Sequence, residues 1–380
     1  MKKFNLRGLP FSNWVNYLVC GFTVFSAQSL SAKPNKALPN YQLVIEECDP
    51  PEFTRPHVYV PPSESEKREV VIAAKKIDIT GYKGAFNPSI VKYGDNYLLT
   101  FRYQPSRSTQ YWISYTGVVV LNEEFEPISN PQLLDTRAHS DQTVSQSEDA
   151  RLVSLNDKLY IVYNDNMETN NPGIGGRRDI YMAELSVAND RFVLAEPVKL
   201  AHDLKHEQIM CQKNWTPFAW KDCLLFVYSM HPHEILASDL KTGVSKTIYD
   251  TYTQKSNHWS LGQMRGGTPA SLVDGEYLSI FHSGHLTTSA ASGDVPMWHY
   301  YMGAYTFSVE PPFGMNKVSA VPIDHPSFYT YSSLSKRVIY PGGLIAAGPV
   351  LYVAYGKDDC EVWVATIDLE ALKRTMIPVN

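Results

Sequence analysis

Short runs of alternating hydrophobic and polar residues recur along this chain, and turn residues separate them in pairs. The clearest pair lies in residues 147–165, SEDARLVSLNDKLYIVYND. Residue types alternate from 150 to 155, Asn156-Asp157 is a turn signal, and 159–163 is a second run rich in apolar and aromatic residues. This pattern predicts a β-hairpin, and the polar pair Glu148-Asp149 lies at its entrance.

The same strand, turn and strand pattern occurs in four further segments, residues 87–102, 216–229, 268–282 and 342–356. An aromatic residue closes every unit, 11 to 13 residues after a common alignment column. The column residues are Pro88, Ala150, Pro217, Pro269 and Gly343, and the closing aromatics are Phe101, Tyr163, Tyr228, Phe281 and Tyr355. Any all-β protein contains several hairpins, but five with a shared closing aromatic and similar spacing favour an all-β fold of the five-bladed β-propeller type.

The first strand of each propeller blade lines the central channel, so the residues at the strand entrances should meet at one end of it. In this chain the entrance residues are Asn87, Asp149, Thr216, Thr268 and Gly342. We expect a ligand to bind at that end.

The N-terminal segment has the features of a targeting signal. Lys2, Lys3 and Arg7 precede a mostly apolar run, residues 14–25, and small residues follow. We therefore expect residues 1–32 to be a signal peptide, or alternatively an uncleaved membrane anchor, and the protein to be exported to the periplasm or the extracellular space. The rest of the chain divides into an extended, Pro-rich lead-in at 33–75, a propeller at 76–370 with a short helix at 370–374, and a C-terminal tail at 371–380.

Composition narrows the class of partner. The formal net charge of the 380 residues is -5 and no basic stripe occurs, so nucleic acid is not an expected partner. The chain contains 24 Tyr, 15 Phe and 7 Trp, which suits stacking on carbohydrate but is equally typical of β-sheets. His202 and His206 lie four residues apart without a third ligand at a suitable spacing, so no metal site is predicted.

The entrance of the second hairpin is the most suggestive place for chemistry. Neighbouring residues of a strand face opposite ways, so Asp149 and Arg151 should share one side and Glu148 should face the other. An acid beside a cation can donate a proton or bind sugar hydroxyls, although an Asp at a strand end can also simply hydrogen-bond its own turn. Other polar residues lie at equivalent places of the later hairpins: Gln212, Lys213, Asn214, Arg265, His282, Asp358 and Asp359.

These motifs resemble those of a known family. EDAR, QKNWTPF, RGGTP with a following FHSGH, and YGKDD occur in the same order in glycoside hydrolase family 130, the β-mannoside phosphorylases and hydrolases. Asn87-Pro88 together with Arg102 resembles the first-blade pattern of that family. The resemblance extends over nearly the whole predicted propeller, and the order and spacing of the motifs carry it, because each motif alone is short.

The resemblance implies an enzyme that cleaves mannosides with inversion, with a role for each matching residue. Asp149 matches the catalytic acid, which acts through the 3-hydroxyl of the bound mannose, and Lys213 and His282 match positions that hold phosphate. The residues expected to bind substrate or support the pocket are Asn87, Arg102, Arg151, Asn214, Arg265, Asp358 and Asp359. The implied ligands are an oligosaccharide or glycoside and, as a co-substrate, inorganic phosphate, with no other cofactor.

Departures from the family pattern leave the reaction open. Ala150 replaces the usual proline after the acid, and only Arg177-Arg178, in a segment that otherwise has the composition of a solvated loop, could supply further phosphate-binding arginines. Phosphorolysis, transfer to a sugar acceptor and hydrolysis all remain possible outcomes. Hydrolysis would need a base roughly 6.5–9.5 Å from the acid, and the candidates are Glu207, Glu234 and Asp294. A five-bladed glycosidase of other specificity and a non-catalytic sugar-binding propeller are the alternatives.

Overall fold

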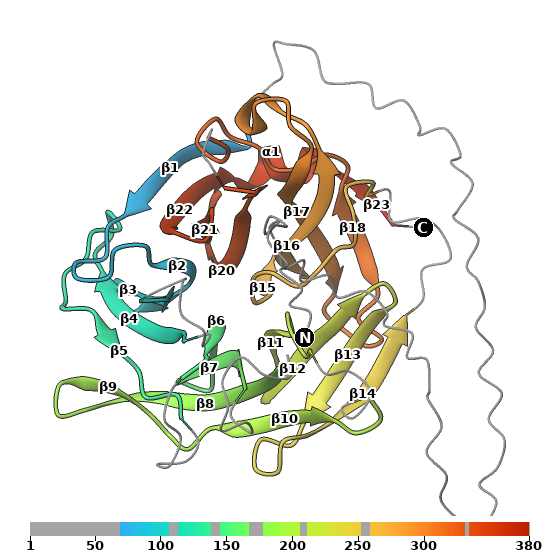
Figure 1. Ribbon diagram of the computed structural model, residues 1–380. Coiled ribbons are helices and arrows are strands. Elements are labelled where there is room, and N and C mark those ends of the chain that lie inside the picture. Colours follow the sequence, from blue (N-terminus) through green and yellow to red (C-terminus); the bar gives the residue numbers. More distant parts are fainter. Residues whose placement is uncertain are drawn as a thin grey trace, which may run out of the picture. The chain divides into compact units, whose positions relative to one another are not determined.

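The computed structural model describes residues 69–105, 113–137, 145–166, 178–205, 211–251, 259–330 and 334–379. All of them belong to one compact unit that begins at residue 58 (Figure 1). The predicted signal segment, most of the lead-in, His206, Glu207 and Arg177 lie outside the described residues. Within the described ranges, no helix is long and apolar enough to span a bilayer.

The prediction of an all-β fold is confirmed. Apart from strands, the described chain contains the 3-10 turn η2, Ala290–Ser292, and the six-residue helix α1, Leu369–Arg374, which matches the helix predicted at 370–374. The five predicted hairpins are all present. They are β2 (Phe86–Tyr93) with β3 (Asn96–Tyr103), β6 (Glu148–Leu155) with β7 (Lys158–Asp165), β11 (Thr216–Trp220) with β12 (Cys223–Met230), β15 (Ser271–Val273) with β16 (Glu276–Thr287), and β20 (Ile339–Ala347) with β21 (Val350–Lys357).

The turn between β6 and β7 shows why the hairpin signal was dependable. Asn156 and Asp157 both have left-handed backbone angles, with φ of 50° and 59°. Two-residue hairpin turns of type I′ require this conformation at both central positions, and Asn and Asp tolerate it better than most residues. The local sequence therefore specifies the connection and, through it, the strand register.

The strands form four sheets. One has the order β2-β3-β4-β5, with β4 at Tyr115–Leu121 and β5 at Gln132–Leu133. A nine-stranded sheet runs β11-β12-β13-β14-β10-β8-β7-β6, with β9 paired to β8, and its added strands are β8 (Asp179–Ala188), β9 (Arg191–Leu194), β10 (Val198–His202), β13 (His233–Ser238) and β14 (Val244–Thr251). A six-stranded sheet contains β15, β16, β17 (Met297–Ser308), β18 (Met315–Ser319), β19 (Lys336–Arg337) and β23 (Met376–Pro378). The fourth sheet has the order β1-β22-β21-β20, with β1 at Val71–Ile77 and β22 at Glu361–Asp368.

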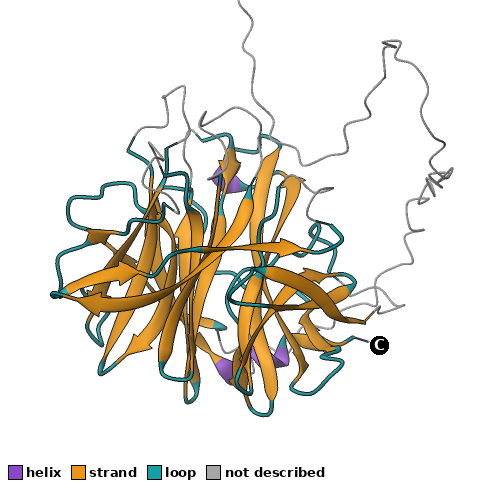
Figure 2. Cartoon of the chain, turned by 90° about the horizontal axis from the view of Figure 1, so that it is seen from below, coloured by secondary structure: helices purple, strands orange, loops and turns teal. Residues whose placement is uncertain are grey.

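Neighbouring strands in the described sheets pair antiparallel except in two parallel pairs, β10 with β14 and β17 with β19. The first of these joins two antiparallel groups of strands in the nine-stranded sheet. Figure 1 shows β2, β6, β11, β15 and β20 nearest the centre of the unit. Figure 2 shows the sheets from the side, with loops gathered at the two ends of the strands. The entrances of the central strands are thereby brought to a common end of the fold.

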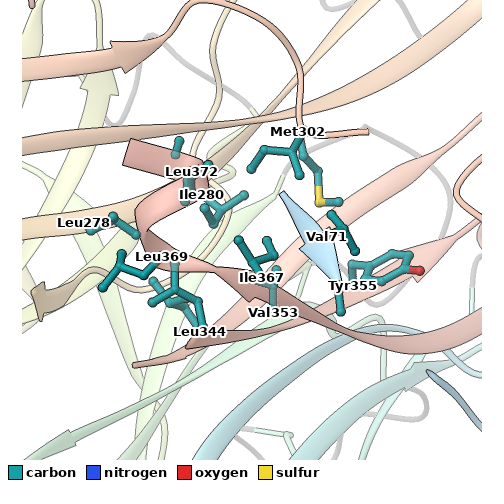
Figure 3. Packing of buried hydrophobic residues seen from close by; sticks show 14 of the residues in the cluster. Val71, Leu278, Ile280, Met302, Leu344, Val353, Tyr355, Ile367, Leu369 and Leu372 are labelled. Atoms are coloured by element: carbon teal, nitrogen blue, oxygen red, sulfur yellow. The ribbon is translucent and has the colours of Figure 1, made fainter. Parts of the chain in front are cut away.

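Apolar side chains fill the spaces between neighbouring sheets. Ile280 and Met302, from the six-stranded sheet, pack with Val353 and Ile367 of the sheet that contains β20 to β22 (Figure 3). All four side chains are fully buried. Burial of a large aliphatic side chain contributes roughly 1.5–3 kcal/mol, so these contacts hold adjacent sheets at a fixed angle and, with them, the residues at the strand entrances.

The first and last strands of the described chain each pair with a strand of a sheet. Strand β1 begins at Val71, inside the segment that we expected to be an extended lead-in, and pairs antiparallel with β22 near the other end of the chain. Strand β23 lies within the expected C-terminal tail and pairs with β18. The sheet-forming chain therefore extends beyond the predicted boundaries of 76 and 370 at both ends.

Candidate active site

Irregular backbone at the strand entrances brings the first site residues together. The registers of β2 and β6 shift between Phe86 and Ser89 and between Glu148 and Arg151. Within these bulges Asn87 and Asp149 take left-handed angles, with φ of 45° and 56°. Bulges re-aim side chains, and here the amide Nδ2 of Asn87 donates to Oδ1 of Asp149 at 2.8 Å.

The two carboxylate oxygens of Asp149 have different environments. Oδ1 accepts from Asn87 and also from NH1 of Arg102, at 3.3 Å. No hydrogen bond from the described residues reaches Oδ2. The side chain is 9% exposed. One oxygen of Asp149 is therefore fixed and the other is available to a ligand.

Glu148 is the centre of a buried charge cluster. Its Oε1 accepts from NH2 of Arg102 at 2.9 Å, and its Oε2 accepts from Nζ of Lys213 at 2.7 Å and from Nδ2 of Asn164 at 3.1 Å. Nε of Arg178 lies 3.9 Å from Oε1. Burial opposes ionisation, but Arg102, Lys213 and Arg178 together hold the pKa of Glu148 well below its usual range. Glu148 is therefore an ionised anchor for three cations and not a proton donor.

The expectation that Glu148 and Asp149 face opposite ways is wrong. Arg102 hydrogen-bonds both carboxylates through different nitrogens. Strict alternation applies to a regular strand, and the left-handed Asp149 lies within a bulge. Although burial opposes it, Glu148, Asp149 and Asp359 raise the pKa of the Arg102 guanidinium, so its charge is secure.

Arg151 lies beside the acid but contacts its backbone. NH1 donates to the Asp149 carbonyl at 3.1 Å, Nε donates to the Gly267 carbonyl at 2.7 Å, and NH2 donates to the hydroxyl of Tyr340 at 2.7 Å. The same hydroxyl donates to Oδ1 of Asn214 at 3.2 Å. Arg151 thus ties together the entrances of several hairpins. Arg151 is therefore a positioning residue. It hydrogen-bonds the backbone carbonyl of Asp149, whereas the carboxylate of Asp149 is bonded by Asn87 and Arg102.

Arg265 and His282 are paired through their backbones, with hydrogen bonds of 2.8 and 3.0 Å. Burial, together with the charges of Arg265 and Arg151, lowers the pKa of His282 well below its ordinary value, while a hydrogen bond to the Gly266 backbone opposes this shift. The imidazole is therefore neutral. Its Nδ1 is buried without a hydrogen-bond partner, as is Nε of Arg265, so the described residues leave the hydrogen-bonding capacity of both atoms unmet.

The two aspartates of the YGKDD motif have different partners. Oδ1 of Asp358 accepts from the Val338 backbone at 3.0 Å, and burial raises the pKa of this carboxyl. Oδ2 of Asp359 pairs with Nζ of Lys336 at 2.6 Å. Because Asp359 also acts electrostatically on Arg102, it is the one of the two that belongs with the charged cluster.

Glycine in the RGGTP motif has a steric reason. A Cβ atom at Gly266 would lie 2.2 Å from the backbone oxygen of Asn214, closer than any real contact. Only glycine lets these two entrance segments approach, and the close approach places the Gly266 carbonyl 3.1 Å from NH2 of Arg151.

The remaining candidates lie elsewhere or outside the described ranges. Glu234, on β13, accepts from Nζ of Lys205 and from Thr247 in a separate buried network with His202. Asp294 is exposed just beyond η2. His233, at the start of β13, packs against Phe307 and bonds the Phe313 carbonyl. In the ranges that the structure covers, no group of three or more His, Cys, Asp or Glu side chains could hold a metal ion.

Sequence reasoning missed the roles of three residues. Strand alternation puts Glu148 on the opposite face, the composition around Arg178 indicates a solvated loop, and the hairpin motifs do not include Tyr340. Arg178 is only 12% exposed and lies by Glu148. Tyr340 could have been found, since it directly precedes the Pro341-Gly342 entrance of the fifth hairpin.

Comparison with known proteins gives a fold match only. Neither a protein-family model nor a curated protein matches the sequence. Among solved structures, the chain is similar to a glycosyl hydrolase from Bacteroides ovatus, with 15% identity over 78% of this chain and 87% of that chain and a TM-score of 0.54.

Two further matches connect with the motifs. One is a structure from a description of the family 130 mannoside phosphorylases, which include hydrolases that target β-1,2 mannosidic linkages; it has 14% identity, covers 76% of this chain and 85% of that chain, and has a TM-score of 0.51. The other is a β-1,2-mannobiose phosphorylase from Listeria innocua in complex with β-1,2-mannobiose, with 13% identity, coverage of 82% and 95%, and a TM-score of 0.50. The resemblance to family 130 seen in the motifs is thus matched by a resemblance in fold.

Proposed function

We propose that this protein cleaves β-mannosides or related glycosides with inversion, on a five-bladed β-propeller. The blades would be β2 to β5, β6 to β10, β11 to β14, β15 to β18 and β20 to β22 with β1. Two observations support this division into blades: the five hairpins, and the parallel pairing of β10 with β14, which divides the nine-stranded sheet into two antiparallel groups.

The observation that carries the catalytic proposal is the state of Asp149. Asn87 and Arg102 fix one oxygen, and the other accepts no hydrogen bond from the described residues. A general acid must present its proton to the substrate with fixed geometry. In the proposed reaction the proton passes from Asp149, through the sugar 3-hydroxyl, to the glycosidic oxygen as the bond to the anomeric carbon breaks.

Inorganic phosphate is the nucleophile that the described residues favour. Arg102, Lys213 and Arg178 lie around Glu148 and Asp149, and Asp359 joins them with its partner Lys336, so the cluster has four cations and three carboxylates. That surplus suits an anionic nucleophile, which needs no general base. Of the three candidate bases for hydrolysis, Glu234 is held by Lys205 and Thr247 and Asp294 lies at a hairpin tip. In phosphorolysis a phosphate oxygen bonds to the anomeric carbon, and the products are a sugar 1-phosphate and the protonated leaving sugar.

His282 would assist as a hydrogen-bond acceptor. Its ring is neutral and its Nδ1 has no hydrogen-bond partner, so we assign the single proton to the other nitrogen. Nδ1 is then left as an acceptor, which fits a hydroxyl of the sugar or of monohydrogen phosphate. This differs from a charged histidine that attracts phosphate as a cation.

The test is product analysis with purified protein and β-1,2-mannobiose, with and without phosphate. We expect mannose and a mannose 1-phosphate, at a rate that rises with phosphate concentration. Free mannose alone, at a rate independent of phosphate, would replace phosphorolysis by hydrolysis. Asp149→Asn should lower turnover by roughly 10²–10⁴-fold and still bind sugar, while Asp157→Asn, at the exposed turn of the same hairpin, should leave turnover unchanged. Equal activity of both variants would exclude Asp149 as the acid.

A further inference from the structure

Among the described residues, one hairpin has a longer second strand than the others, and its extra residues lie at the end of the fold that holds the candidate site. The second strands β3, β7, β12 and β21 each end two residues after their closing aromatic, at Tyr103, Asp165, Met230 and Lys357. Strand β16 ends six residues after Phe281, at Thr287. The four extra residues add about 13 Å of strand. They extend past the level of His282, at the end of the fold where the site lies.

The pairing of β16 with β17 defines what this extension presents. Residues directly opposite one another, and every second residue along a strand, share a face. His282, Gly284 and Leu286 of β16 oppose Met302, Tyr300 and Trp298 of β17. One face of the hairpin therefore carries a continuous row from the buried His282 to the exposed tip.

The row changes from polar to apolar and from buried to exposed. The ring of Tyr300 stacks on that of His282, with centroids 6.1 Å apart and planes 11° from parallel. A Cβ atom at Gly284 would lie 3.4 Å from the indole of Trp298 and 3.5 Å from NH2 of Arg265. Trp298 is 43% exposed and Leu286 is 56% exposed. The indole and Leu286 thus continue the site outward as an apolar surface.

The opposite face of the extension is rigidly supported. Arg337 is fully buried and its Nε donates to the Ala291 carbonyl, in the turn at the hairpin tip, at 2.7 Å. Buried His299, which neighbours Trp298 on the other face, bonds the hydroxyl of Ser289 at 2.7 Å. Strand β19 pairs parallel with β17 at Trp298 and His299. A tip held in this way presents Trp298 with little conformational entropy left to lose on binding.

We propose that Trp298 and Leu286 form a distal subsite that binds a sugar unit of a longer oligosaccharide, while the reacting unit occupies the site at Asp149. Aromatic rings offer an apolar face to the C–H face of a sugar, and their polar neighbours bind its hydroxyls. Here the polar neighbour is the guanidinium of Arg265, whose NH2 would lie 3.5 Å from a Cβ atom at Gly284 and whose Nε has no hydrogen-bond partner. The inference rests on the proposed function for the identity of the sugar, and it makes oligosaccharides the preferred substrates over disaccharides.

The experiment compares binding of β-1,2-mannobiose and β-1,2-mannotetraose by calorimetry, in the Asp149→Asn background so that no turnover occurs. We expect Trp298→Ala to lower the tetraose affinity about tenfold more than the biose affinity, as loss of an interface tryptophan does. Trp298→Tyr, which keeps a ring, should recover much of that difference. Leu272→Ala is the control. Leu272 is an exposed apolar residue of the same sheet (63% exposed), but it lies on β15, beside the turn to β16 and away from the site, so its loss should affect neither sugar.

The outcomes separate this inference from the proposed function. An equal loss for both sugars would make Trp298 a structural residue and overturn the subsite, as would no loss for either or an absence of tetraose binding. If the tetraose binds through Trp298 but the protein with Asp149 intact converts no mannoside, the catalytic proposal fails and the subsite stands. Circular dichroism of Trp298→Ala confirms that a lost affinity is not a lost fold.

Discussion

Protonation of Asp165 should control the stability of this protein near neutral pH. The side chain is 3% exposed, at the end of β7, and its Oδ1 accepts hydrogen bonds from the backbones of Asn166 and Gln146 at 2.6 and 3.1 Å. Burial raises its pKa from 3.8 to about 7, although those hydrogen bonds and the charge of Arg178 oppose the shift. The folded protein thus binds this proton more tightly than the unfolded chain does.

The linkage between proton binding and folding gives the sign and the size of the effect of pH on the unfolding free energy. Because the pKa is raised in the folded state, the associated stability is fully present below pH 3.8 and is lost as the pH rises through about 7. A shift of about three units corresponds to roughly 4 kcal/mol as an upper bound. Asp165→Asn removes the titration and keeps an oxygen that can accept the same two hydrogen bonds. We therefore expect the variant to resemble the original protein at pH 4 and to be more stable than it by up to that amount at pH 8.

Urea unfolding followed by tryptophan fluorescence at pH 4, 6 and 8 measures this effect. The quantity of interest is the difference in unfolding free energy between variant and original protein, because other titrating groups cancel in it. Asp157→Asn provides the control, since Asp157 is exposed in a turn and its difference should not vary with pH. A difference for Asp165→Asn that is the same at all three pH values would refute the reasoning.

Three further substitutions test the site and the sheets by unfolding measurements. Glu148→Gln leaves Lys213 without a carboxylate partner and Arg102 with Asp149 alone, so it should cost about 3–5 kcal/mol; a cost below 1 kcal/mol would contradict the cluster. Gly266→Ala pushes a Cβ against the Asn214 backbone and should lower both Tm and glycoside turnover, whereas an unchanged Tm would show that the segments can separate freely. Lys76→Ala removes an ion pair whose lysine is 43% exposed. Solvent screens such a pair, so the loss of unfolding free energy should be less than about 1 kcal/mol, and a larger loss would contradict this reasoning.

The hairpins could be predicted because their determinants are local. The turn residues Asn156 and Asp157 specify their own backbone conformation, and a closing aromatic such as Phe281 is fully buried where neighbouring strands meet. Strands β1 and β23 could not be found in this way, because each pairs with a partner far along the chain. The residues of β1 and β23 themselves do not indicate which strand each will pair with.

The site was predictable in its members and less so in its contacts. Asn87, Arg102, Asp149 and Lys213 do lie in one hydrogen-bonded cluster. The hydrogen bonds of Arg102 to both Glu148 and Asp149 could not be inferred, because they depend on a β-bulge. The alternation of polar and apolar residues does not reveal such a bulge. The separate network around Glu234 was equally hidden, since its partners come from β10 and β14.

The pairing of β1 with β22 also has a consequence for biosynthesis. Lys76 and Glu361, which pair across these strands, are 285 residues apart, so at ribosomal rates of about 5–20 residues per second β1 waits roughly 15–60 s for its partner. Until then its edge is open to other chains, and no nascent intermediate can close the ring of sheets. We therefore expect this protein to complete folding only after β22 has been synthesised, and fragments that stop before β22 to be prone to aggregation.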